Sequence, residues 1–167
     1  YEIVFGDWSS DVCSSDLSDL HFNVLTFDFR GHGESPGQVI SSISEQAQRG
    51  YLLDARAAYQ RAASLPYADP SRIIGIGTSI GADAVVDACE QGCVGVFAIS
   101  PGSFLGLGWY DNAYRVMNAG NPVRCLYSVN SPSANECLSL AENALYKVLP
   151  AEGKKHGQDF LVPRKME

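Results

Sequence analysis

A serine between two glycines is the residue of this sequence best placed to act as a nucleophile. Gly77-Thr78-Ser79-Ile80-Gly81 has the pattern G-x-S-x-G and lies between a predicted strand and a predicted helix. At such a junction the serine hydroxyl stands above the sheet, where a histidine can accept its proton. The backbone amide of Ile80 begins the helix and can donate to a developing oxyanion. The pattern therefore predicts Ser79 as a catalytic nucleophile and the Ile80 amide as half of an oxyanion hole.

The same glycines allow two other interpretations. A glycine-rich turn without chemistry has a similar composition. A dinucleotide-binding loop needs a third glycine where this chain has Ile80, and no Gly-Lys-Ser or Gly-Lys-Thr completes a P-loop. A nucleotide-binding domain is therefore the alternative to a catalytic turn, and the strand before and the helix after Ser79 favour the catalytic turn.

A nucleophilic serine needs a base, and the chain has three histidines. His156 follows the last predicted strand, which is the place that the chain order serine, acid, histidine requires. His32 precedes the serine in the turn RGHG, and we expect it to fix that turn through hydrogen bonds. His21 is expected to be a surface residue. His156 is thus the predicted general base, with an exposed loop histidine as the alternative.

Alternating strands and helices are expected to position these residues. Strands are predicted at residues 22–29, 73–77, 94–99, 123–129 and 145–149, and helices at 51–65, 82–89 and 134–143. The apolar residues of the first helix recur at the spacing of one helical face, at Ala55, Ala58, Ala62 and Leu65. This alternation predicts an α/β fold, a mostly parallel sheet with helices on both faces, in a single domain.

With these features placed, the chain resembles the α/β-hydrolase superfamily near its dienelactone-hydrolase and serine-aminopeptidase-like esterase branches. FNVLTFDFRGHGES resembles the fourth strand and following turn of that fold, and DPSRIIGIGTSIGAD the fifth strand and nucleophile elbow. VFAISPG resembles the sixth strand and NPVRCLYSVNSPS the seventh. The resemblance implies a serine hydrolase of a small-molecule ester or related acyl bond, acting through an acyl-serine and without a cofactor. The alternative is a non-catalytic homologue that acts as a binding or scaffold protein.

The sequence departs from the family pattern at the acid. Members carry it after the seventh strand, but Asn130 and Ser131 stand there. Asp111, after the sixth strand, is a second candidate because some members place the acid there, and a solvated loop aspartate is its alternative. Asp83 is interpreted as a charge in the first turn of a helix, where the dipole favours it. The match also lacks the family's early strands and the loop with the second oxyanion donor, so residues 18–167 are expected to be the C-terminal portion of one domain.

The first 17 residues stand apart. The segment 7–17, DWSSDVCSSDL, resembles a translated sequencing adapter, and we predict that residues 1–17 are an artefact of that kind. They hold four carboxylates and no basic residue, so the net charge of −7 becomes −3 for residues 18–167. In the fold of the resemblance an interior strand lies between residues 22–29 and 73–77, and the β-prone run Tyr1 to Phe5 can fill that place. Expressed alone, the chain is expected to be insoluble or molten, and hydrolytically silent.

Composition and residue spacing limit the kinds of protein, partner and site that the sequence allows. A chain of 167 residues that is 46% hydrophobic is long enough to form one core. No run of 18 apolar residues occurs, so no membrane segment is predicted. The acidic balance, with few clustered lysines or arginines, argues against a nucleic-acid partner. The five cysteines form no C-x-x-C pair and have no histidine at ligand spacing, so no metal site is predicted and the compartment stays open.

Overall fold

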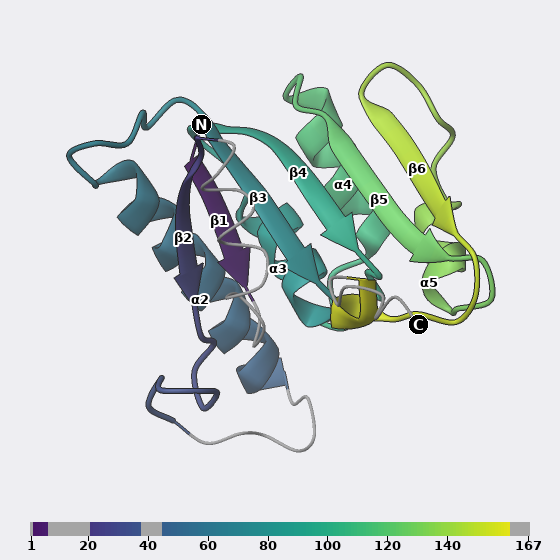
Figure 1. Cartoon of the computed structure of the whole chain (residues 1–167), viewed down its shortest axis with the longest axis horizontal. Coiled ribbons are helices and arrows are strands. Elements are labelled where there is room, and N and C mark those ends of the chain that lie inside the picture. The colour runs from purple at the N-terminus through teal and green to yellow at the C-terminus, as the bar shows by residue number, and fades with distance from the viewer. Residues whose placement is uncertain (1, 7–20, 38–44, 161–167) are drawn as a thin grey trace, which may run out of the picture.

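The computed structural model describes residues 2–6, 21–37 and 45–160. Within these ranges the chain forms one six-stranded parallel sheet in the order β2-β1-β3-β4-β5-β6 (Figure 1). The strands are β1 (Glu2–Gly6), β2 (Asn23–Phe27), β3 (Ile73–Thr78), β4 (Cys93–Ile99), β5 (Val123–Ser128) and β6 (Tyr146–Ala151). The predicted α/β class with a parallel sheet is confirmed, and all five predicted strands are present.

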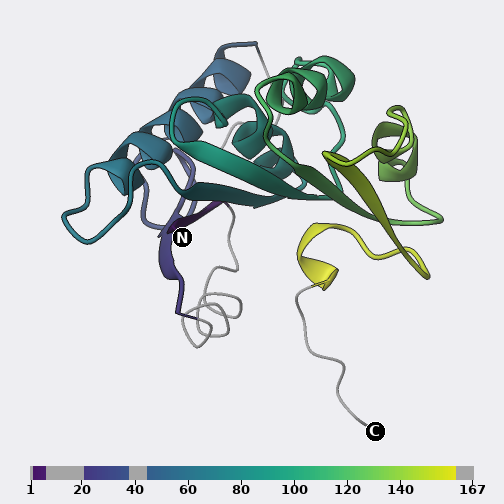
Figure 2. The same cartoon turned by 90° about the horizontal axis from the view of Figure 1, so that it is seen from above.

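The strand order determines on which face of the sheet the connecting helices lie. They are α2 (Glu45–Ala63), α3 (Ile80–Ala88), α4 (Trp109–Asn118), α5 (Ser133–Cys137) and the short 3-10 helix η1 (Gly157–Phe160). The steps from β3 to β4, β5 and β6 all run in one direction, and right-handed crossovers then place the connecting helices on the same face. Figure 2 shows α2, α3 and α4 over one face of the sheet and η1 on the other side. Within the described ranges, no helix is both long and apolar enough to cross a membrane.

Two helices differ from the sequence prediction. No helix was predicted where α4 lies, although its buried residues have helical spacing: Trp109, Ala113, Val116 and Met117. The helix predicted over 134–143 ends at Cys137. The hydroxyl of Ser139 donates to the carbonyl oxygen of Glu136 at 2.7 Å, a local bond that competes with helix continuation. Asn143 then accepts two backbone amides and turns the chain toward β6.

The core lies between the sheet and helices α2 and α3. All residues of α3 from Gly81 to Ala88 are buried. The predicted face of α2 is confirmed, since Ala55, Ala58 and Ala62 are buried. Such burial of small residues lets α2 and α3 pack closely over the strands that lead to Ser79.

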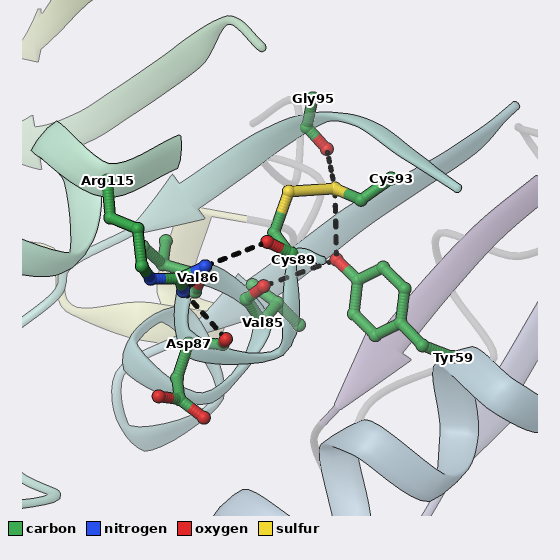
Figure 3. The surroundings of a disulfide bond; sticks show 8 residues. All are labelled: Tyr59, Val85, Val86, Asp87, Cys89, Cys93, Gly95 and Arg115. Atoms are coloured by element: carbon green, nitrogen blue, oxygen red, sulfur yellow. Dashed lines mark hydrogen bonds between the residues drawn. A yellow bond between two sulfur atoms is a disulfide. The ribbon is translucent and has the colours of Figure 1, made fainter. Parts of the chain in front are cut away.

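Two disulfides brace the second half of the sheet. Cys89–Cys93 joins the end of α3 to the start of β4 (Figure 3), and Cys125–Cys137 joins β5 to α5. In the same region the Arg115 guanidinium donates to the carbonyl oxygens at the end of α3: Val86, Asp87 and Cys89. These bonds satisfy carbonyls that have no partner within the helix. Pairing was not predicted from the sequence, although residues 18–167 hold an even number of cysteines, four, and their spacing alone does not identify the pairs.

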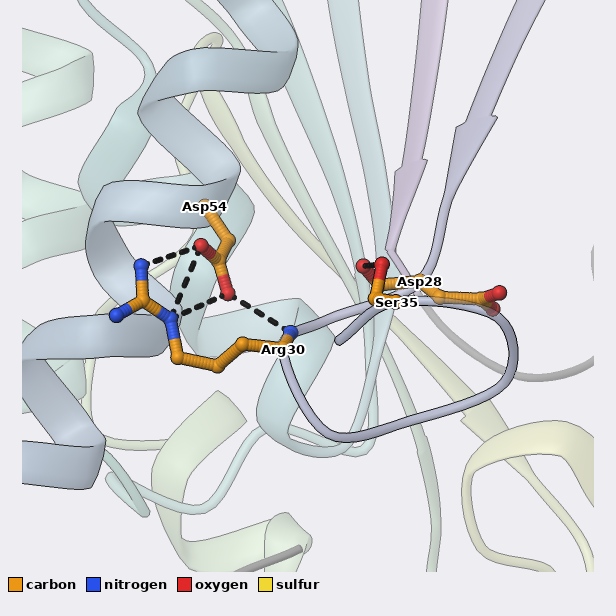
Figure 4. A network of polar contacts seen from close by, with 4 residues as sticks. All are labelled: Asp28, Arg30, Ser35 and Asp54. Carbon is orange, nitrogen blue, oxygen red and sulfur yellow. Dashed lines mark hydrogen bonds and ion pairs between the residues drawn. The ribbon is translucent and has the colours of Figure 1, made fainter. Parts of the chain in front are cut away.

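An ion pair fastens the turn after β2 to α2. The Arg30 side chain donates to both carboxylate oxygens of Asp54, and the Arg30 backbone amide donates to the same carboxylate at 2.9 Å (Figure 4). The Ser35 hydroxyl closes the turn by donating to the Asp28 carbonyl oxygen at 2.7 Å. The turn RGHG is therefore held against α2 beside the end of β3.

Strand β1 lies between β2 and β3 and is parallel to both. Glu2 pairs in register with Asn23 on one side and with Ile73 on the other. The prediction that the N-terminal run can occupy this interior place is confirmed for residues 2–6. Residue 1 and residues 7–17 of the predicted adapter segment lie outside the described residues.

Candidate active site

Ser79 stands at the sharp turn between β3 and α3. Its backbone has φ 53° and ψ −120°, a conformation that non-glycine residues adopt at a cost of about 1–3 kcal/mol. Surrounding hydrogen bonds hold it there: its amide donates to the Ile99 carbonyl oxygen at 2.8 Å, and its carbonyl oxygen accepts from Ala82 at 3.0 Å. The fold therefore supports a strained turn that presents the half-buried serine at the carboxyl edge of the sheet.

Glycine at position 77 is required by close backbone approach. A Cβ at Gly77 would overlap the carbonyl oxygen of Gly81, so the strand and the first turn of α3 can pass each other only without a side chain there. This contact explains the first glycine of the G-x-S-x-G pattern in physical terms.

His156 lies opposite the serine. Its Nε2 is 3.0 Å from the Ser79 Oγ, a hydrogen-bond distance, although the two residues are 77 positions apart in sequence. His156 belongs to the exposed loop between β6 and η1. The structure thus brings together the two side chains that the sequence nominated as nucleophile and base, in a geometry that permits proton transfer.

The backbone around His156 is anchored on both sides. The His156 amide donates to the Asp159 carboxylate at 3.2 Å, and the Asp159 amide returns a bond to the His156 carbonyl oxygen. The next amide, on Gly157, donates to the buried Ser100 Oγ at 3.1 Å. The Phe104 ring meets the His156 ring edge-on, with 6.3 Å between centroids.

The candidate acids do not join this pair. Among the described residues, no carboxylate forms a hydrogen bond with the His156 ring. Asp111 lies exposed in the first turn of α4, and Asn130 is exposed in the turn after β5. Ser131, beside it, donates from its hydroxyl to the Ser128 carbonyl oxygen at 2.9 Å.

Ile80 is the first residue of α3, so its N–H has no acceptor within the helix. Beside it lies a cavity of about 180 Å³ formed by Phe29, His32, Tyr51 and residues 78–81. His32 contacts the Tyr51 hydroxyl at 3.2 Å and stacks on its ring, which agrees with the expected role in fixing the turn. A larger groove of about 840 Å³ lies between α2 and the end of α3, but none of the candidate site residues lines it.

The structure corrects the interpretation of Asp83 as a charge that only serves the end of its helix. It does lie in the first turn of α3, but its side chain is 6% exposed and accepts backbone amides from another segment, those of Gly102 and Phe104. Burial raises the pKa of its carboxyl to about 6, against the lowering effect of those bonds. The sequence carried no sign of this contact, because it joins residues about 20 positions apart through the sheet. His21 is exposed, as expected.

No group of three or more potential metal ligands occurs in the part of the chain that the structure describes. The groups that the described structure brings together at the site are the Ser79 hydroxyl, the His156 imidazole and the amide at the start of α3.

Comparison with known sequences gives a short match. No protein-family profile matches the chain. The uncharacterized proteins MT2364 and Rv2307c from two strains of Mycobacterium tuberculosis are each 36% identical to it over 75 residues. The match covers 45% of this chain and 24% of each relative, so the chain corresponds to about a quarter of those proteins.

Solved structures resemble the chain more extensively. The Pyrococcus furiosus esterase Pf2001 superposes with a TM-score of 0.65 at 18% identity, over 90% of this chain and 73% of that one. A dienelactone hydrolase-like promiscuous phosphotriesterase from metagenomic libraries gives 0.64 at 18% identity, over 93% and 70%. A puromycin-hydrolyzing peptidase of Mycobacterium tuberculosis gives 0.63 at 20% identity, over 93% and 30%. At these identities the likeness shows the fold alone, and the chain has the α/β-hydrolase fold.

Proposed function

We propose that this chain carries the catalytic serine and histidine of a hydrolase that acts on an ester or related acyl bond. The observation that carries the proposal is the 3.0 Å contact between Ser79 Oγ and His156 Nε2. The positive φ of Ser79 and its place before the first turn of α3 support it, because both features are needed to expose a nucleophile beside an oxyanion donor.

The reaction follows from these three groups. Ser79 Oγ attacks the acyl carbon while His156 Nε2 takes the hydroxyl proton, and the Ile80 amide donates to the oxygen that becomes negative. His156 then returns the proton to the leaving group, and the acyl-serine forms. A water that gives its proton to His156 attacks the acyl carbon, and His156 returns that proton to Ser79 Oγ as the Oγ–acyl bond breaks and the acid product leaves. The cavity between Phe29, Tyr51 and the serine suits a small apolar group of the substrate.

We also propose that residues 18–167 are the C-terminal portion of one hydrolase domain and that residues 1–17 derive from a sequencing adapter. The in-frame match of residues 7–17 supports this. Recovering the uninterrupted gene from the source genome tests it. An upstream sequence that encodes residues 1–17 unchanged would contradict the proposal.

Labelling with a fluorophosphonate probe tests the function. The protein should contain the uninterrupted natural sequence before residue 18. The probe is expected to modify Ser79, and Ser79→Ala to abolish labelling. Ser64→Ala is the matched control, because Ser64 is an exposed serine just after α2 whose hydroxyl donates to the nearby Arg61 carbonyl oxygen. Labelling that survives Ser79→Ala would contradict the assignment.

A second function, a non-catalytic homologue that binds or scaffolds, has one specific observation in its favour. In the described residues no carboxylate supports the His156 ring, and loss of a triad carboxylate typically lowers kcat about 10⁴-fold. The same probe separates the two functions. A scaffold would leave Ser79 unmodified under conditions in which the protein is folded.

A further inference from the structure

The loop after β4, residues 100–104, contacts the candidate base His156 and the residue that follows it. Ser100 Oγ accepts the Gly157 amide, which fixes the backbone next to His156. The Phe104 ring meets the His156 ring edge-on, at an interplanar angle of 86°. These contacts restrain both the backbone and the ring of a residue that otherwise lies exposed in a loop.

The loop itself needs support, because two of its residues are strained. Ser100 has φ 54° and Ser103 has φ 53°, in the region that non-glycine side chains rarely adopt. Such residues persist only where neighbouring structure holds them. The 100–104 loop can therefore keep this backbone conformation only if contacts from neighbouring segments hold it.

Two acidic side chains fasten it. Asp83 Oδ1 accepts the Gly102 amide at 3.2 Å and Asp83 Oδ2 accepts the Phe104 amide at 2.6 Å. Ser103 Oγ donates to Glu136 of α5 at 3.2 Å and accepts the Trp109 amide at 3.0 Å. Asp83 lies one helical turn beyond Ser79, so the same helix that begins at the nucleophile also sets the loop beside the base.

We propose that the 100–104 loop, set by Asp83 as a positioning residue, orients His156 where a Ser-His-Asp site would use a carboxylate. This inference rests on the proposed function. Its basis is that the ring has no carboxylate partner among the described residues, while its backbone and one edge are held by this loop. Orientation of the base is one of the two services that the aspartate supplies in that arrangement; stabilising the imidazolium is the other.

Gly102 offers a way to disturb the loop at a single point. A Cβ on Gly102 would overlap the Phe104 ring, and the Gly102 backbone is outside the positive-φ region, so alanine there moves the ring without straining the chain. Gly108 is the matched control. It has φ −61°, and its Cβ would meet only the Asp111 side chain, at an ordinary 3.6 Å.

The experiment compares Gly102→Ala with Gly108→Ala in the uninterrupted protein. The first readout is the second-order rate of fluorophosphonate labelling at Ser79, and the second is the position of the His156 ring-proton signals in NMR spectra. Gly102→Ala is expected to slow labelling roughly 10- to 100-fold, the scale of a misplacement of about 1 Å, and to shift the ring signals. Gly108→Ala is expected to change the rate less than twofold and to leave the signals in place.

Asp83→Asn provides a second variant, because the two loop amides bond different carboxylate oxygens and the substitution turns one of these acceptors into an NH2 donor. It is expected to slow labelling and to shift the same His156 signals as Gly102→Ala. Normal labelling of the wild type with equal rates in Gly102→Ala and Gly108→Ala would overturn the inference, as would unchanged ring signals. If the wild type is not labelled at all, the proposed function fails, and the ring signals alone decide whether the loop positions His156.

Discussion

The two halves of the candidate site are built by different means. The elbow at Ser79 is made from neighbours in sequence: strand β3, the close pass of Gly77 over Gly81, and the first turn of α3. The loop that carries His156 is exposed and depends on Ser100 and on the 100–104 loop, more than 50 positions away. The difference teaches that the turn at the nucleophile is shaped mainly by residues 77–81, with one bond to Ile99 of β4, whereas the base depends on contacts from a distant segment.

His156→Gln tests the separation between activity and stability most strongly. Loss of the base should slow labelling of Ser79 by about 10³-fold or more. The free energy of unfolding should change by less than about 0.5 kcal/mol, because the side chain is exposed. Probe kinetics and urea unfolding measure the two quantities. A large loss of stability would mean that the histidine loop is part of the structural core, which would contradict the contrast drawn between the two halves of the site.

Gly77→Ala, unlike His156→Gln, should lower the stability of the fold as well as the labelling of Ser79. The added methyl overlaps the Gly81 carbonyl oxygen, so we expect a loss of about 3 kcal/mol in the free energy of unfolding, together with loss of labelling. Gly153→Ala is the control in the histidine loop. A Cβ at Gly153 meets nothing within 4 Å, and only its φ of +96° should cost about 1 kcal/mol. Equal losses in the two variants would show that the elbow is no more sterically determined than the loop.

Asp83 connects α3, which begins next to Ser79, to the 100–104 loop beside His156. The effect of pH on its contribution to stability tests this connection. The pKa of its carboxyl is raised to about 6 in the folded chain, against about 3.9 when unfolded. The folded state therefore binds more protons between these values, so the stabilising contribution is present below about pH 4 and is lost as the pH rises through about 6. The free energy of unfolding of Asp83→Asn, measured relative to wild type, should therefore be roughly 1–2 kcal/mol higher at pH 8 than at pH 5.

Urea unfolding of both proteins at the two pH values measures this change. A difference in stability that is independent of pH would mean that Asp83 titrates normally, and that its burial carries no electrostatic cost.

Ser131→Asp has the smallest expected effect. It places a carboxylate after β5, where the resemblance puts the acid, and we expect labelling to rise about tenfold if that position faces the His156 ring, because the imidazolium then gains a negative neighbour. Asp111→Asn is expected to leave labelling unchanged, since Asp111 is exposed and does not contact His156. No gain in Ser131→Asp together with a large loss in Asp111→Asn would move the acid role to Asp111.

Much of the fold could be predicted from local patterns. The strands of residues 18–167 were identified by short β-branched runs bounded by glycine and proline, and α2 by its alanine face. Helix α4 was not predicted, although Trp109, Val116 and Met117 have helical spacing. Helix α5 was placed too long, because its end is set by side-chain bonds and by the disulfide to β5.

The sequence by itself determined the elbow. Position 77 must be glycine because a side chain there would overlap the Gly81 carbonyl oxygen, and this steric conflict lies within five residues of a strand-to-helix junction. It also nominated His156, by chain order alone. Only the tertiary structure decided that His156 Nε2 reaches the serine, that Ser100 and Phe104 hold it, and that Asp83 is buried rather than solvated. The physical reason is that these contacts join separate crossovers of a parallel sheet, whose carboxyl ends meet at one edge only after the strands have paired.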